Sequence, residues 1–121
     1  MTDITMGAVE ARFAGIIWDN EPITAAELAK LADTHLNWKK TTAYTALKRL
    51  CEKGIFRNDG GTVTSVLSRE EYQARQSRKF VDETCGGSVP MFLAAFTRRK
   101  DLSRKDLEEI RRMLDDYERE V

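Results

Sequence analysis

The sequence contains few of the residues that small proteins use for special chemistry. Among 121 residues there are one histidine, two cysteines and two prolines. Cys51 and Cys85 lie far apart and neither belongs to a Cys-x-x-Cys motif, which excludes a zinc ribbon or a disulfide framework. No apolar run is long enough to span a bilayer, and the first residues lack the layout of a signal peptide. We therefore expect a cytoplasmic protein without membrane insertion.

Patterns that would indicate catalysis or cofactor binding are equally scarce. His35 has no second histidine or cysteine at a metal-ligand spacing. The glycine pairs 60–61 and 86–87 do not form a phosphate-binding loop. Acidic pairs at 70–71, 108–109 and 115–116 fall on expected helix surfaces, where solvated charge is ordinary. The sequence predicts no enzyme, no metal site and no cofactor.

Charge, by contrast, is abundant. Twenty basic and twenty acidic residues give a net charge of zero, and 41% of the chain is apolar, enough for a modest core. The zero total hides a local excess. Between Trp38 and Arg57 there are six basic residues and one acid, Glu52, so this segment of twenty residues carries a charge of +5. Clustered positive charge of this kind favours a nucleic-acid partner.

Short polar motifs indicate where helices begin. In a capping box a hydroxyl accepts a hydrogen bond from the amide three residues on, and an acidic side chain there bonds back. The three motifs of this type are Thr24–Glu27, Ser68–Glu71 and Ser103–Asp106. A weaker start at Gly7, with Glu10, precedes an expected apolar face of Val9, Phe13, Ile16 and Ile17.

These starts and the apolar spacing predict six helices. The expected ranges are 8 to about 18, 25 to about 32, a start at 37–41 to 53, 69 to about 84, 89–96, and 104 onward. Leu28 and Leu31 should face inward from the second helix. In the third, Ala43, Leu47 and Leu50 form the buried stripe, with Gly54 as the left-handed residue that follows.

A β-hairpin is predicted directly after the third helix. The β-prone runs 55–57 and 62–67 flank Asn58-Asp59-Gly60-Gly61, and such glycines supply the positive φ angles of tight turns. Three helices followed by a hairpin is the order of a winged helix-turn-helix. The predicted fold class is mainly α with a small β-hairpin. A winged-helix DNA-binding domain would cover residues 1–67, and a helical dimerisation domain residues 68–121.

The third helix presents the candidate DNA-binding surface. Opposite its apolar stripe stand hydroxyls and long cations, a combination suited to base edges and phosphates in a major groove. The candidates are Trp38, Lys39, Lys40, Thr41, Thr42, Tyr44, Thr45, Lys48, Arg49, Lys53 and Arg57. Thr42, Thr45 and Lys48, with Tyr44, are expected to read bases, and the flanking cations to contact phosphate. For Trp38, packing and an indole contact to phosphate are both open, whereas Trp18 is expected to pack.

The C-terminal third contains a candidate dimer interface. Leu107, Ile110, Leu114 and Tyr117 repeat with spacings of three and four, as in a heptad seam, and Leu93 and Phe96 extend it. A helix this short is marginal alone, so its apolar face must be buried. The alternative is packing within the same chain, through Tyr72 and Phe80. Intermolecular packing is favoured because three short helices make too small a core for a separate lobe.

The ordered set of motifs resembles the penicillinase-repressor family of the BlaI and MecI type, with the CopY copper repressors as relatives. The resemblance rests on these segments: Ile16-Ile17-Trp18, Ile23 to Leu28, Trp38 to Gly54 with its Thr42, Thr45, Leu47, Arg49, Leu50 and Lys53, Ser68 to Tyr72, and Gly87-Ser88 followed by an apolar run to Phe96. It implies a homodimeric repressor that binds double-stranded DNA at a pseudo-palindromic operator and controls antibiotic-resistance or related stress genes.

The resemblance also implies a mode of release. Family members that respond to β-lactams are cut at an Asn–Phe bond through a membrane sensor-protease system, and here the matching bond is Ala95–Phe96. The paired Cys-x-Cys motifs of the copper-responsive relatives have no counterpart, so copper sensing of that kind is not expected. The alternative function is a winged-helix protein-interaction module without specific DNA binding. Such a module would not need the basic segment between Lys39 and Arg57.

Overall fold

The computed structural model describes residues 3–121, and Met1 and Thr2 lie outside the described residues. The chain divides into two compact units, one through Ser77 and one from Arg78 to Val121. The division falls inside a helix, α4 (Arg69–Cys85), whereas the sequence suggested a boundary between 67 and 68. The first turns of this helix therefore belong to the N-terminal unit, and the two units are described separately below.

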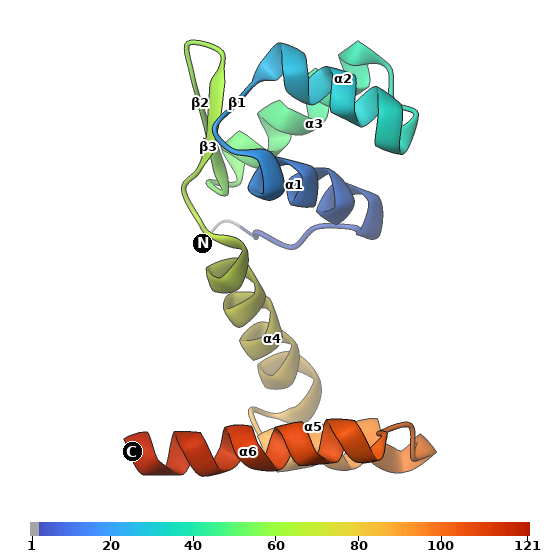
Figure 1. The fold of residues 1–121 in the computed structure, drawn as a ribbon, viewed down its shortest axis with the longest axis vertical. Coiled ribbons are helices and arrows are strands. Elements are labelled where there is room, and N and C mark those ends of the chain that lie inside the picture. The colour runs from blue at the N-terminus through green and yellow to red at the C-terminus, as the bar shows by residue number, and fades with distance from the viewer. Residues whose placement is uncertain (1–2) are drawn as a thin grey trace. The chain divides into compact units, whose positions relative to one another are not determined.

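The N-terminal unit has the element order of a winged helix-turn-helix (Figure 1). Its elements are α1 (Ala8–Asn20), β1 (Ile23–Thr24), α2 (Ala25–Leu36), α3 (Lys40–Glu52), β2 (Phe56–Asp59), β3 (Thr62–Ser65) and the beginning of α4. Helices α2 and α3 form the helix-turn-helix pair, and β2 and β3 form the wing. The predicted fold class is confirmed.

Local chemistry explains where these helices begin and end. The Thr24 hydroxyl accepts a hydrogen bond from the Glu27 amide at 3.1 Å and so starts α2. Helix α2 continues four residues beyond its predicted end at Ala32 and stops where Asn37 adopts a left-handed conformation with φ of 56°. Asn37 is one of the few residue types that tolerate this conformation. Gly54, with φ of 80°, follows α3 as predicted.

A three-stranded antiparallel sheet with the order β1-β3-β2 contacts α1 through β3 and α3 through β2. The hairpin turn contains Gly60 and Gly61, both at positive φ, and the Asn58 side chain accepts a hydrogen bond from the Gly61 amide at 2.9 Å. Strand β1, in which Ile23 pairs with Val63, was not predicted. Two residues are too few to show the alternation by which a strand is recognised in a sequence.

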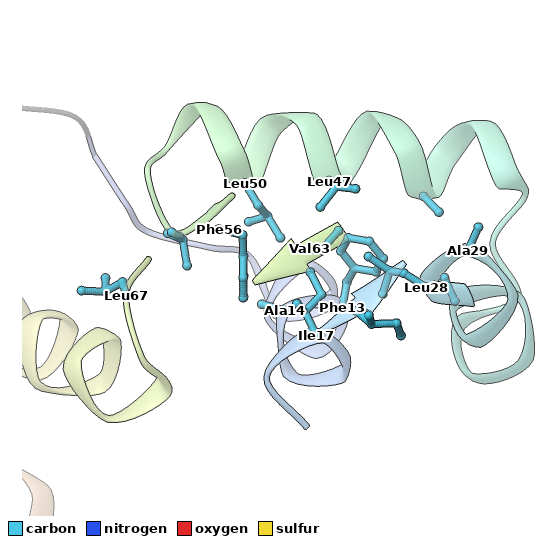
Figure 2. Close-up of a cluster of buried hydrophobic side chains, with 14 residues drawn as sticks. Phe13, Ala14, Ile17, Leu28, Ala29, Leu47, Leu50, Phe56, Val63 and Leu67 are labelled. Carbon is cyan, nitrogen blue, oxygen red and sulfur yellow. The ribbon is translucent and has the colours of Figure 1, made fainter. Parts of the chain in front are cut away.

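The core of this unit brings together side chains from every element (Figure 2). Phe13 and Ile17 of α1 point toward Leu50 of α3, Phe56 of β2 and Val63 of β3, and all five are essentially fully buried. Leu28 is buried as predicted, and Leu31 is half-buried. The prediction for Val9 is wrong: this side chain is 49% exposed, because the buried face of α1 begins only at Phe13.

The C-terminal unit consists of the end of α4 followed by α5 (Val89–Phe96), a 3₁₀ turn (Thr97–Arg99) and α6 (Arg104–Glu120). Helix α5 has the predicted bounds. Ser103 and Asp106 form the predicted capping box at the start of α6. The core here is small, with Val81 and Cys85 of α4 buried and Phe80 lying edge-on to Phe92 at 6.0 Å. Within residues 3–121, no helix combines the length and apolarity needed to cross a membrane.

Removal of a core aromatic ring should destabilise the N-terminal unit strongly. Phe56 is 2% exposed, so we expect Phe56→Ala to lower the free energy of unfolding by about 3–5 kcal/mol, through lost burial and the remaining cavity. Urea denaturation measures this change. The control is Val66→Ala at a half-exposed position, which should change the free energy of unfolding by less than about 0.5 kcal/mol. Equal effects of both substitutions would contradict the assignment of the core.

Candidate nucleic-acid interface

Helix α3 buries one face and exposes the other. Ala43, Leu47 and Leu50 are buried against the core, as their spacing predicts. The exposed face and the adjoining segments carry nine of the candidate DNA-binding residues, all of which are solvent-exposed. These are Lys39, Lys40, Thr41, Thr42, Tyr44, Thr45, Lys48 and Arg49 around α3, and Arg57 on β2. The fold therefore gathers hydroxyls and cations on one accessible surface beside the wing.

Contacts along α3 already order some of these side chains. The Lys40 ammonium lies 5.6 Å from the centre of the Tyr44 ring, a distance at which a cation is attracted to an aromatic face. The Thr45 hydroxyl donates to the Thr41 carbonyl at 2.9 Å. This bond uses the proton of Thr45 but leaves the lone pairs of its oxygen available as acceptors. A base amino group, which donates a hydrogen bond, can thus find a fixed acceptor in the Thr45 oxygen.

Trp38 is half-buried and packs against the core. Its ring centre lies 5.0 Å from that of Phe13, so the packing role that the sequence left open is present in the structure. Within residues 3–121 its indole N–H has no hydrogen-bond acceptor, and no buried side-chain polar atom there lacks a partner. The N–H is therefore accessible from outside, and packing does not exclude a contact with phosphate.

Two hollows of about 420 Å³ each flank the start of α3, and Trp38 lines both. The hollow between α1 and α3 is lined by Glu10, Trp38, Thr41, Thr42, Thr45 and Arg49. The hollow on the α2 side is lined by Ala26, Lys30, Asp33, Trp38, Lys39 and Lys40. The hollow between α1 and α3 offers hydroxyl, indole and guanidinium groups, and the hollow on the α2 side offers an indole and three ammonium groups beside the Asp33 carboxylate. Donors of these kinds can hold phosphate oxygens.

Lys53 has a different environment from the other candidates. Its ammonium contacts the Glu10 carboxylate at 2.9 Å and donates to the Thr5 carbonyl at 2.8 Å. The two charged side chains are only 19% and 16% exposed. Lys53 is thus engaged inside the unit, and it neutralises the one carboxylate that lines the hollow between α1 and α3. The structure therefore places the Lys53 ammonium on groups of its own unit, whereas the sequence predicted a phosphate contact for it.

Arg57 remains accessible on the wing. Its guanidinium lies 3.9 Å from the Asp59 carboxylate, and both side chains are more than half exposed. Such a pair contributes little free energy and is readily exchanged for another anion. Cys51 is half-buried, and burial together with the neighbouring Glu52 charge raises the pKa of its thiol. No three His, Cys, Asp or Glu side chains in residues 3–121 are grouped so as to hold a metal.

The apolar residues proposed for dimerisation stay exposed within one chain. Leu93, Phe96, Leu107, Leu114 and Tyr117 are all exposed, and Ile110 is half-buried. Phe80 makes an edge-on ring contact with Phe92 of α5, at 6.0 Å, and its side chain remains 53% exposed. Tyr72 belongs to the N-terminal unit, where its ring lies 5.7 Å from that of Trp18. Met91 and Met113 are exposed apolar residues that the heptad pattern did not include.

A winged helix with a basic recognition helix, followed by helices with an uncovered apolar face, defines a class of transcription regulator. Within that class, the chain belongs to the penicillinase repressor family, whose sequence profile matches residues 6–116. The resemblance inferred from the motifs is thereby confirmed. Members of this family repress transcription.

Named relatives cover nearly the whole chain. The methicillin resistance regulatory protein MecI of Staphylococcus aureus strain Mu50 is 24% identical over 113 residues, which are 90% of this chain and 92% of that protein. The protein of the same name from Mammaliicoccus sciuri is 23% identical with the same coverage. The penicillinase repressor of Staphylococcus aureus is 22% identical over 105 residues, covering 84% of this chain and 83% of the relative.

Replacement of Lys53 should destabilise the N-terminal unit, because it leaves the Glu10 carboxylate unpaired. We expect Lys53→Met to lower the free energy of unfolding by about 1–3 kcal/mol, because Glu10 loses its partner in a half-buried position. The double variant Lys53→Met with Glu10→Gln should recover most of this loss, since no unpaired charge remains. Urea denaturation of both variants and of Glu10→Gln alone completes a double-mutant cycle. Strictly additive effects would show that the two side chains do not interact.

Proposed function

We propose that this chain is a sequence-specific repressor that binds double-stranded DNA as a homodimer at a pseudo-palindromic operator. The observation that carries the proposal is the exposed face of α3, where hydroxyls and cations stand opposite a fully buried stripe and next to the wing. Family membership supports it. The helix would lie in the major groove, with the wing against the neighbouring backbone.

The side chains of α3 divide into two groups by their position. Thr42, Thr45 and Lys48 are proposed to contact base edges, with Tyr44 beside them. Threonine can bond to a base or touch a thymine methyl, and lysine can reach guanine. The remaining donors are proposed to bind phosphate and so to set the register without reading sequence: Trp38, Lys39, Lys40, Thr41, Arg49 and Arg57. Lys53 assists by neutralising Glu10.

The alternative of a protein-interaction module gains no support from this surface. An interface for protein normally has an apolar centre depleted of charge. The exposed face of α3 instead carries Lys40, Lys48 and Arg49 around two threonines. An enzyme is not proposed either, since the family to which the chain belongs consists of transcription repressors.

The second half of the proposal is the homodimer. One recognition helix reads a short stretch of groove, and a second copy related by two-fold symmetry doubles the contacts. The apolar face formed by Leu107, Ile110, Leu114 and Tyr117 of α6, with Leu93 and Phe96 of α5, is proposed as the surface that the two copies share. Burial of these side chains supplies the free energy of association.

The regulated genes are proposed from the names of the relatives, and the release mechanism from the family resemblance. Two of them are named as regulators of methicillin resistance and one as a penicillinase repressor, so antibiotic-resistance or related stress genes are the proposed targets. The Ala95–Phe96 bond lies at the end of α5 with both residues exposed. A membrane sensor-protease system acting in the cytoplasm would find this bond accessible after the last turn of α5 opens.

Substitution of a base-reading threonine should relax sequence discrimination. Thr45→Ala removes a contact that we expect to be worth about 1–3 kcal/mol at one operator position. The matched control is Thr34→Ala on α2, because Thr34 is also exposed and donates to the carbonyl four residues earlier, at 3.1 Å. Titration of operator and scrambled duplexes should show a reduced ratio of affinities for Thr45→Ala alone. Unchanged ratios for both variants would remove Thr45 from the proposed interface.

Charges placed in the shared surface should separate the two copies. We expect Ile110→Asp with Leu114→Asp to yield folded monomers with much weaker operator binding, because the apolar contact is lost. The control places the same two charges on the polar side of α6, as Lys105→Asp with Arg112→Asp. Sedimentation equilibrium measures both. A monomeric unmodified protein at micromolar concentration would contradict the dimer and the two-fold operator together.

A further inference from the structure

The first residue of α4 is attached to α1 by polar contacts. The Arg69 guanidinium donates to the Gly15 carbonyl at 3.0 Å and forms an ion pair with Asp19 at 2.8 Å. Its centre also lies 5.6 Å from that of the Trp18 ring. Arg69 therefore contacts three neighbouring groups of α1: the Gly15 carbonyl, the Asp19 carboxylate one turn later, and the Trp18 ring. Both polar contacts are made by the same guanidinium nitrogen, so that one end of the side chain is attached to two points of α1.

Further contacts continue along the same face of α4. Tyr72 lies one turn beyond Arg69, and its hydroxyl accepts a hydrogen bond from the Met6 amide at 3.2 Å. Gln76, one turn further, accepts from the Thr5 hydroxyl at 3.2 Å. Positions separated by three, four and seven residues share one side of a helix. The beginning of α4 is thus held at three successive turns by α1 and by the segment that precedes it.

These contacts differ in what they contribute. The Tyr72 ring packs against Trp18 and is part of the core margin, so its removal would affect folding. The Arg69 side chain is 37% exposed, and exposed ion pairs contribute little to stability. Its position at the first residue of a 17-residue helix nevertheless gives it control over direction. A helix of that length extends about 25 Å, so a tilt of about 10° at its start moves its far end by about 4 Å.

That displacement is comparable to one base-pair step of DNA, since one turn of about 10 base pairs spans about 34 Å. We infer that Arg69 is a positioning residue: it sets the direction in which α4 leaves the winged-helix unit and thereby the separation of operator half-sites that the dimer accepts. This inference rests on the proposed function, because it concerns a dimer bound at two half-sites.

The test compares operators that differ only in the separation of their half-sites. Duplexes bound by the full-length, unmodified protein are first selected from a random pool, and the enriched operator is then rebuilt with one or two base pairs inserted or removed at its centre. Affinities are measured for Arg69→Gln and for the matched control Arg75→Gln. Arg75 is an exposed residue on the same helix, so its substitution removes the same charge without a contact to α1.

We expect the unmodified protein and Arg75→Gln to favour one separation strongly. For Arg69→Gln, the ratio of affinities between the preferred separation and its neighbours should fall about threefold or more, because a less constrained linkage tolerates more arrangements. For a duplex with a single half-site, Arg69→Gln and Arg75→Gln should have the same affinity. Asp19→Asn, which removes the ion pair from the α1 side, should change the ratio in the same direction. Sedimentation and thermal unfolding confirm that each variant is a folded dimer.

Two results would overturn the inference while leaving the proposed function intact. One is an unchanged ratio for Arg69→Gln in a protein that still selects an operator. The other is an equal loss of affinity at every separation for Arg69→Gln and Arg75→Gln. That result would show that the loss of a positive charge, and not the contact with α1, causes the change. Failure of the unmodified protein to enrich any sequence would instead overturn the proposed function, and the inference with it.

Discussion

The packing of Trp18 is the interaction on which the rest of the N-terminal unit depends. Its ring lies 5.2 Å from Phe56 of the wing and 5.7 Å from Tyr72 of α4, while its indole N–H donates to the Leu67 carbonyl at 3.0 Å. One side chain at the end of α1 thus contacts the sheet, the connection that follows it and the next helix. The aromatic surface supplies burial, and the single hydrogen bond fixes where the chain turns into α4.

Placement of charge, rather than its total, separates the surface of α3 from the remainder of the chain. The protein has equal numbers of acidic and basic residues, yet the cations around α3 stay exposed. The carboxylate that lines the hollow between α1 and α3, that of Glu10, is paired internally with Lys53. An anion that approaches the hollow between α1 and α3 therefore meets donors from three kinds of side chain and little repulsion. Attraction of this type acts before contact is made and weakens with salt.

Local patterns predicted much of this structure, and distant contacts were the part that they missed. Helix α5 was predicted with its observed bounds because its apolar run follows the glycine pair that breaks α4, and in the structure the Ser88 hydroxyl caps it by accepting from the Met91 amide. The exposed face of α3 followed from its three buried apolar residues. The partner of Lys53 could not be predicted, because Glu10 lies 43 residues earlier in the chain. Strand β1 exists only because β3 pairs with it, which no local pattern encodes.

The contacts between the first residues and α4 bear on how the chain folds during its synthesis. The Thr5 hydroxyl reaches Gln76 across 71 residues, and the Met6 amide reaches Tyr72 across 66. The N-terminal unit can therefore close fully only after the ribosome has released the first two turns of α4. From that moment it can fold while α5 and α6 are still being made, since domains generally fold as units in the order of their synthesis. Each nascent chain would complete its winged helix before it can meet a second copy.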